Sequence, residues 1–107
     1  MKLQSTIKAS SILGLLLTRS AQASFYVCTL ENFAGNCQLY ELPYDDCYTF
    51  DRPFVRTVVS AGPDKTSWCT LYANPGCTGD ELNLHYPGLT SLGAWNNKAA
   101  SFNCAAE

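Results

Sequence analysis

The chain has 107 residues, six of them cysteine, and its seven Lys and Arg against nine Asp and Glu give a formal net charge of −2. This acidic balance, without a basic patch, disfavours nucleic acid and anionic lipid surfaces as partners, because their phosphates repel negative charge. A single histidine and the absence of a C-x-x-C motif argue against a zinc site built from thiolates.

Residues 1–23 have the three parts of a secretory signal peptide. Lys2 and Lys8 make the start basic, residues 12–17 form a short apolar run, and Ala21-Gln22-Ala23 is a small-x-small cleavage site. The apolar run is far shorter than the ~20 residues that a bilayer span needs. We therefore expect a secreted, extracellular protein. Its mature part, residues 24–107, has 84 residues and, with four basic against nine acidic side chains, a net charge of −5.

A domain of this size buries too little apolar surface to be stable without additional links. All six cysteines lie in the predicted mature part, and an even number in a small secreted chain predicts three disulfides. They are Cys28, Cys37, Cys47, Cys69, Cys77 and Cys104. Six cysteines allow 15 pairings, so composition alone leaves their connectivity open.

Short runs rich in aromatic and β-branched residues, separated by turn residues, predict strands and no long helix. These runs are residues 25–30, 37–42, 56–60, 67–72, 81–86 and 99–104. The pattern is typical of an all-β sandwich or barrel. Alternation in the run 81–86 places Leu82, Leu84 and Tyr86 in the core and His85 on the polar face, as an ordinary surface group.

The segment 43–53, P-Y-D-D-C-Y-T-F-D-R-P, is the least regular part and suits an exposed loop held by Cys47. Thirteen aromatic residues exceed what a small core needs. We therefore expect several, among them Tyr44, Tyr48 and Phe54, near the surface, although they could instead shield the sheet ends. An aromatic and acidic loop on a rigid frame is a candidate binding surface. Its residues are Tyr44, Asp45, Asp46, Tyr48, Phe50 and Asp51.

The chain also repeats itself. Cys28-Thr29-Leu30 returns 41 residues later as Cys69-Thr70-Leu71, and Cys37 returns 40 residues later as Cys77. Each copy has a turn with Asn, Gly and Cys between its first two strands. A repeat of about four short strands predicts two stacked motifs, residues 24–62 and 66–104, that share one core.

The second repeat resembles a βγ-crystallin Greek-key motif. That family has an aromatic residue at the end of the first strand and a glycine seven positions later, as Tyr72 and Gly79 are placed here. The family's W-N-D-like loop before a serine is similar to Trp95-Asn96-Asn97 followed by Ser101. In the first repeat Glu31 takes the aromatic position, no glycine follows seven residues later, and only Ser60 matches.

The resemblance implies a small βγ-crystallin-like sandwich of two Greek keys, stapled by disulfides. In such a motif the first and fourth strands are antiparallel neighbours, which implies a bridge from Cys69 to Cys104. The short, cysteine-rich form is similar to small secreted microbial proteins, some of which are killer toxins, metalloprotease inhibitors or effector candidates.

Calcium is the family's usual ligand, bound by the stretch N/D-N/D-x-x-S/T-S with oxygens from both motifs. In residues 96–101 Ala100 replaces the hydroxyl residue of the fifth position, Lys98 adds a positive charge, and no carboxylate is present. Residues 55–60 keep only the final Ser60. Because Ca²⁺ needs six to eight oxygen ligands, we expect no metal and no other cofactor.

Catalytic chemistry is not expected either. His85 is the only histidine, no G-x-S-x-G motif occurs, and the paired carboxylates Asp45-Asp46 and Asp80-Glu81 are neighbours that point to opposite sides of an extended chain. We expect a monomeric binding or effector protein that recognises an extracellular protein or a cell-wall component. A killer-toxin-like antimicrobial protein and a protease inhibitor acting through residues 43–53 are the alternatives.

Overall fold

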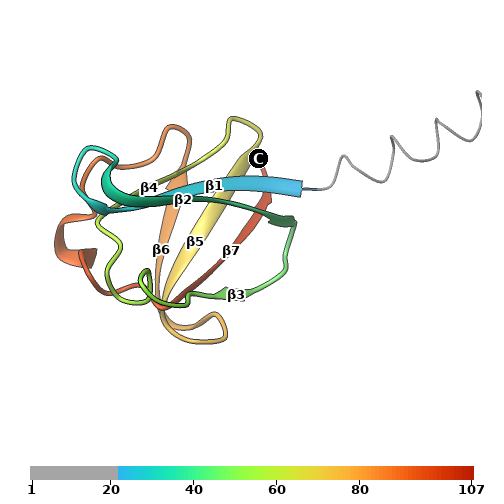
Figure 1. Cartoon of the computed structure of the whole chain (residues 1–107). Coiled ribbons are helices and arrows are strands. Elements are labelled where there is room, and N and C mark those ends of the chain that lie inside the picture. Colours follow the sequence, from blue (N-terminus) through green and yellow to red (C-terminus); the bar gives the residue numbers. More distant parts are fainter. Residues whose placement is uncertain (1–21) are drawn as a thin grey trace, which may run out of the picture.

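The computed structural model describes residues 22–107, which form two antiparallel β-sheets packed against each other (Figure 1). The first sheet has the strand order β2-β1-β4, with β1 at Gln22–Leu30, β2 at Ala34–Pro43 and β4 at Ser60–Pro63. The second has the order β3-β7-β5-β6, with β3 at Tyr48–Thr49, β5 at Ser67–Asn74, β6 at Thr78–His85 and β7 at Ser101–Ala106. A 3-10 turn, η1 at Gly93–Trp95, precedes β7. The predicted all-β sandwich is confirmed.

Each half of the chain adds a segment to the sheet of the other half. β3, from the first half, pairs with β7, where Tyr48 lies opposite Phe102. Leu89, from the second half, forms a single antiparallel bridge with Ala61 of β4. This exchange is the Greek-key connection, and it joins both halves around one core.

The predicted signal peptide, residues 1–23, lies outside the described residues apart from its last two. Gln22 and Ala23 begin β1, where Ala23 is buried and pairs with Leu42. The expected cleavage position after Ala23 therefore falls inside a strand. No helix within residues 22–107 is long and apolar enough to cross a membrane.

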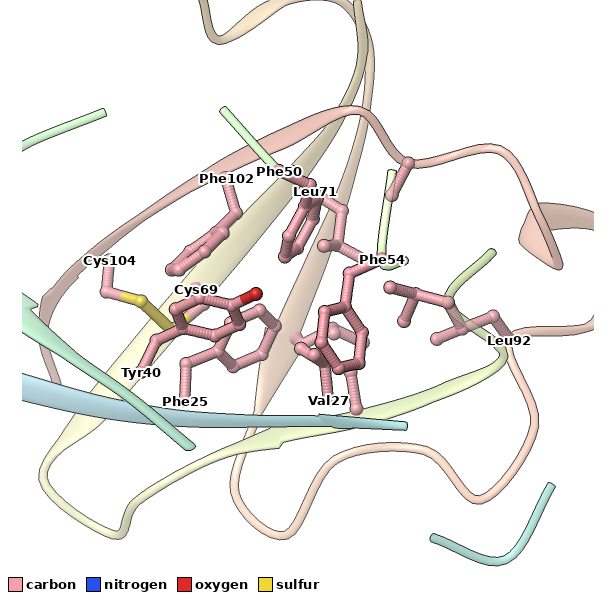
Figure 2. Close-up of a cluster of buried hydrophobic side chains, with 14 of the residues drawn as sticks. Phe25, Val27, Tyr40, Phe50, Phe54, Cys69, Leu71, Leu92, Phe102 and Cys104 are labelled. Carbon is pink, nitrogen blue, oxygen red and sulfur yellow. A yellow bond between two sulfur atoms is a disulfide. The ribbon is translucent and has the colours of Figure 1, made fainter. Parts of the chain in front are cut away.

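Aromatic side chains from both sheets fill the space between them (Figure 2). Phe25 of β1 and Phe102 of β7 lie at the centre, with ring centroids 4.8 Å apart, and Tyr40 of β2 lies 5.5 Å from Phe102. Phe50 and Phe54, only 3% and 6% exposed, belong to the same cluster. The predicted place of Phe50 in a binding surface, and of Phe54 near the surface, is therefore wrong.

The physical reason is the course of the chain after β3. Phe50 N donates a hydrogen bond to Ala100 O at 2.9 Å, which holds the segment against the start of β7. The chain then turns, with Phe54 N donating to Asp51 O at 2.8 Å. Both phenyl rings point inward and close the end of the sandwich (Figure 2).

The strand predicted at residues 56–60 is also wrong, since β4 begins only at Ser60. The preceding residues form turns, in which Arg56 has a φ of 55° and Thr57 N donates to Phe54 O at 3.1 Å. Val58 is fully buried although it lies outside any strand. Its β-branched side chain fills the core from a loop, so its residue type misled the strand prediction.

Leu84 is buried and Leu82 packs against the core, as alternation predicted, but Tyr86 is 52% exposed. The core assignment of Tyr86 is therefore wrong. β6 ends at His85, and Gly88 N then donates to His85 O at 2.7 Å in a turn. Alternation applies only while the backbone remains a strand.

All six cysteines form disulfides, which confirms the predicted number. The bridges are Cys28–Cys37, Cys47–Cys77 and Cys69–Cys104. Cys69 and Cys104 are opposite each other on β5 and β7, so the implied pairing is confirmed. Cys47–Cys77 ties the segment 43–53 to the hairpin between β5 and β6.

The two hairpins correspond in a different register from the one that the repeated Cys-Thr-Leu suggested. Leu30 pairs with Ala34 in the first hairpin, as Asn74 pairs with Thr78 in the second. Cys28 is therefore equivalent to Tyr72, and Gly35 to Gly79. The assignment of Glu31 to the aromatic position is therefore wrong. Cys28 takes that position, and Gly35 follows it by seven residues with a φ of 82°, against 88° for Gly79.

Two serines hold the hairpins in the same way, which supports this register. Ser60 Oγ accepts a hydrogen bond from Phe33 N at 3.1 Å and donates one to Leu30 O at 2.7 Å. Ser101 Oγ accepts from Cys77 N at 2.8 Å and donates to Asn74 O at 2.6 Å. The equivalence of the two motifs is therefore given by these hydrogen bonds and not by the repeated Cys-Thr-Leu sequence.

We expect the substitution Gly35→Ala to lower the free energy of unfolding by about 2 kcal/mol, because an L-residue at this φ is strained. A Cβ at Gly35 would also lie 2.8 Å from Leu30 Cγ. Gly76→Ala is the matched control, since Gly76 has a φ of 72° with open space around its Cβ position. It should cost about 1 kcal/mol. Urea denaturation of both variants measures the difference, and equal losses would contradict the role given to Gly35.

Candidate functional site

The predicted binding segment 43–53 exposes its acidic residues and turns its aromatic residues toward the core. Asp45, Asp46 and Asp51 are exposed, whereas Tyr44 and Tyr48 are half-buried and pack against the core cluster. The segment is held by the Cys47–Cys77 bridge and by Asp45 N, which donates to Cys104 O at 2.7 Å. The segment thus presents an acidic rim of three carboxylates to solvent, with its half-buried tyrosines against the core.

Tyr40 shows how deeply the neighbouring aromatic cluster is buried. Burial, helped by the nearby Tyr48 hydroxyl and the Asp51 carboxylate, raises the pKa of Tyr40 to about 12. Its ring contacts Tyr48, with centroids 4.9 Å apart. The phenol remains protonated at any physiological pH, so Tyr40 acts as a core residue and not as an acid or base.

Apolar side chains lie exposed on the outer face of β1 and β2, a surface that sequence reasoning missed. Leu30, Leu39 and Tyr26 are 57%, 53% and 39% exposed. Tyr26 and Leu39 lie directly opposite each other across the two strands, and the Phe33 ring stacks on Tyr26 with centroids 6.1 Å apart. Alternation could have revealed them, because Tyr26 and Leu30 have the opposite parity to the inward-facing Phe25 and to Val27.

We call these four residues, Tyr26, Leu30, Phe33 and Leu39, the outer apolar face. Glu41 has the same strand parity as Leu39, Glu31 follows Leu30 in the hairpin, and both are exposed. From Gln22 to Pro43 the chain carries no Lys, Arg or His. The surroundings of the outer apolar face are therefore acidic.

No ligand-sized cavity opens among residues 22–107, and no group of three or more His, Cys, Asp or Glu gathers there. His85 lies exposed on β6, with Nδ1 3.2 Å from Glu107 Oε1 and its ring stacked on Trp68 at 5.5 Å. Neither neighbour is a serine or cysteine that the imidazole could activate. The described surface offers flat faces for contact rather than a pocket for a small molecule.

The fold-motif residues predicted from the sequence lie near one another at the junction of the motifs. Tyr72 pairs with Ser101, Gly79 forms the hairpin, and Trp95 ends η1 and packs against the core cluster. Tyr72 O accepts a hydrogen bond from Ala100 N at 2.8 Å. These residues therefore shape the fold around residues 55–60 and 96–101, the two stretches to which the resemblance in sequence assigns calcium.

The calcium stretches, residues 55–60 and 96–101, have a donor set that does not fit the ion. Both serine hydroxyls are already engaged by the hairpins. Arg56 Nη2 donates to Ala73 O at 3.0 Å, and Lys98 Nζ lies 3.3 Å from Asp80 Oδ2. The one buried side-chain oxygen without a hydrogen bond in the described part of the chain is Asn96 Oδ1, a neutral amide. Two cations and one free amide oxygen do not make a site for a hard dication.

No protein-family model matches the sequence, and no curated protein matches it. Solved structures do match. A βγ-crystallin domain from Flavobacterium johnsoniae superposes with a TM-score of 0.65 at 18% identity, over 78% of this chain and 94% of that one. A structure concerned with the evolution of the eye lens βγ-crystallin domain fold gives a TM-score of 0.68 at 16% identity, over 81% and 89%.

A third similar structure is a βγ-crystallin domain of Abundant Perithecial Protein from Neurospora crassa in its Ca²⁺-bound form. It gives a TM-score of 0.61 at 11% identity, over 81% of this chain and 90% of that one. At such identities the likeness concerns the fold alone, and the calcium belongs to the Neurospora protein.

Proposed function

We propose that this chain, which has a βγ-crystallin fold linked by three disulfides, is a secreted binding protein. Its ligand is an extracellular or cell-wall protein whose contact surface is apolar and basic. The single observation that carries the proposal is the exposed pair of Tyr26 and Leu39, extended by Phe33 and Leu30. Exposed apolar side chains that adjoin one another on a rigid sheet are typical of protein interaction sites.

The chemistry of the partner follows from the shape and charge of this face. A flat face without a cavity contacts a macromolecule better than it encloses a small molecule. Glu31 and Glu41 border the outer apolar face, and no cation lies on β1 or β2. Electrostatic complementarity therefore favours Lys or Arg on the partner. A tyrosine at the centre of an apolar patch is the usual kind of anchor in such interfaces.

Secretion is supported by the disulfides, which persist in oxidising compartments. A second observation concerns the predicted cleavage position. Ser24 N lies 2.7 Å from Asp64 Oδ2, so cleavage after Ala23 would bring the new α-ammonium group against a carboxylate. Burial raises the pKa of Asp64, but hydrogen bonds from Ser24, Thr66 and Ser67 outweigh it and leave the pKa below its usual range. Asp64 is thus ionised and ready to receive a positive terminus.

The outer apolar face can be tested with a double variant, Tyr26→Ser and Leu39→Ser. Both side chains are exposed, so the thermal midpoint should change by no more than a few degrees. The immobilised variant should retain at least tenfold less of the partner recovered from secreted and cell-wall protein fractions, because a central anchor is worth about 2 kcal/mol or more. Recovery by the parent should fall as salt is raised.

The matched control is the triple variant Asp45→Asn, Asp46→Asn and Asp51→Asn, which alters the acidic rim and leaves the outer apolar face intact. It should recover the same partner at nearly the parental level. Loss of recovery in the control alone would place the contact on residues 43–53 instead. That result, together with stoichiometric inhibition of a protease, would favour the inhibitor alternative. Growth inhibition of microbes by the pure protein would favour the killer-toxin-like alternative.

A further inference from the structure

The two loops that correspond to the calcium stretches are bonded to each other across the junction of the motifs. Arg56 N donates to Ala99 O at 2.9 Å, and Asn97 N donates to Val58 O at 3.0 Å. Arg56 and Asn97 both have positive φ, 55° and 64°. The two loops are therefore equivalent and related by a pseudo-twofold arrangement, with Arg56 in the place that Asn97 has in the other motif.

The Arg56 side chain reaches from the first motif to the second. Its Nη2 donates to Ala73 O at 3.0 Å. Ala73 lies at the irregularity between Tyr72 and Asn74, where the register of the β5–β6 ladder shifts. The extra residue of this irregularity lies on β6, where Gly79 and Asp80 stand opposite Ala73 alone. Ala73 itself is paired in neither the β5–β6 nor the β5–β7 ladder, and its carbonyl accepts the Arg56 side chain instead. The guanidinium thus takes a backbone oxygen of the kind that hard cations use as a ligand.

Arginine is an uncommon residue at positive φ, where Asn, Asp and Gly are favoured. Strain of this kind persists only where surrounding contacts hold the residue in place. Here the backbone bond to Ala99 O and the side-chain bond to Ala73 O supply those contacts. The side chain therefore offsets the strained backbone by linking the two motifs.

In the second loop, a lysine side chain neutralises a nearby carboxylate. Lys98 Nζ lies 3.3 Å from Asp80 Oδ2 and 4.6 Å from the centroid of the Trp95 ring. The Asp80 carboxylate thus has a side-chain cation as its partner, just as the Ala73 carbonyl has the Arg56 guanidinium. Each loop thus carries one positive side chain of its own, Arg56 in the first and Lys98 in the second.

We propose that Arg56 is a built-in cation that replaces calcium at the junction of the two Greek keys, so that folding and stability of this domain do not depend on metal. The consequence is specific to this chain. The domain keeps its structure in any calcium concentration, and the Arg56 guanidinium performs the linking role.

Thermal unfolding of the oxidised chain in EDTA and in about 10 mM CaCl2 tests the proposal. A calcium site as strong as those of extracellular modules, with a Kd of about 10⁻⁴ M, would raise the midpoint by about 10 °C or more at that concentration. We expect a change below about 1 °C, which is far smaller than that linkage predicts. A rise of several degrees in the parent chain would overturn the proposal.

Variants locate the effect at Arg56. Arg56→Ala should lower the midpoint by about 4 to 8 °C, which corresponds to a loss of about 1 kcal/mol for one hydrogen bond from a charged donor at an exposed site. Arg56→Lys, which keeps the charge, should recover part of that loss. Arg52→Ala is the matched control, because Arg52 is an exposed arginine four positions earlier and should behave like the parent. Equal midpoints for all four proteins would refute the linking role.

A gain of calcium binding would show that Arg56 occupies the ion's place. The double variant Arg56→Asp and Val59→Ser removes the cation and supplies a carboxylate and a hydroxyl in the same stretch. It should unfold at a lower temperature than the parent in EDTA and recover several degrees in about 10 mM CaCl2, with titration calorimetry giving a matching binding isotherm. No response to calcium in a folded double variant would refute this placement.

Discussion

Replacing Phe102 by alanine is expected to lower the free energy of unfolding by about 4 kcal/mol, within the usual range for a fully buried phenylalanine. Phe102 is fully buried on β7, in the strand that joins β3 to β5. Its ring centroid lies 4.8 Å from that of Phe25 on β1 and 5.1 Å from that of Phe50, just after β3. Truncation therefore leaves a cavity bounded by these aromatic rings (Figure 2).

The loss is large for this protein because a domain of this size has a total stability of only about 4 to 13 kcal/mol. Urea denaturation of the oxidised protein measures it. Phe102→Leu, which retains most of the volume, should cost about 1.5 kcal/mol or less. Tyr26→Ala is an external control at an exposed aromatic residue and should cost less than about 1 kcal/mol. Similar losses for Phe102→Ala and Tyr26→Ala would contradict the position of Phe102 at the centre of the core.

Removing the Cys69–Cys104 disulfide by a double alanine substitution should cost about 4 kcal/mol by the loop-closure model. The bridge joins residues 35 positions apart and therefore restricts the unfolded chain strongly. It also links directly opposite residues of β5 and β7, at the centre of the second sheet. Both cysteines are buried, so the change removes packing as well.

The Cys28–Cys37 bridge provides the comparison, because it also joins directly opposite residues but closes a separation of only 9. The same model gives about 2.7 kcal/mol for it, or about 1 kcal/mol less. Denaturant unfolding of the two double variants, each with the remaining bridges verified by mass spectrometry, gives both values. A smaller loss for the 69–104 pair than for the 28–37 pair would show that the entropy of the unfolded chain does not set the difference between the two bridges.

Local patterns were sufficient for the strands that are half-buried and regular. Residues 67–72 were assigned correctly from their aromatic and β-branched side chains. Residues 81–86 were assigned correctly up to His85, because alternating apolar residues are typical of a strand with one face on the core. The family resemblance supplied the glycine at position 79, whose φ of 88° agrees with that assignment. The family resemblance added the partner of Cys69, which no local pattern provides.

Patterns failed where a side chain's surroundings come from distant parts of the chain. Phe50 and Asp51 are neighbours in an acidic loop, yet the first is buried and the second exposed, because β7 passes beside Phe50. Val58 is a core residue placed by a turn rather than by a strand. The Cys-Thr-Leu repeat misled the alignment of the two motifs for a similar reason. Which residues of the two hairpins are equivalent depends on the backbone groups that Ser60 and Ser101 contact.

The sequence by itself determined that the chain is an all-β, disulfide-linked domain, because residue type and spacing govern strand formation and six cysteines in a small chain find partners. Only the tertiary structure decided which face remains open and what links the two motifs. Tyr26 is exposed because nothing within residues 22–107 covers the outer face of β1 and β2. Arg56 meets Ala73 because the Greek-key crossing brings together residues that are 17 positions apart. Contacts of this kind follow from the path of the whole chain and not from any local segment.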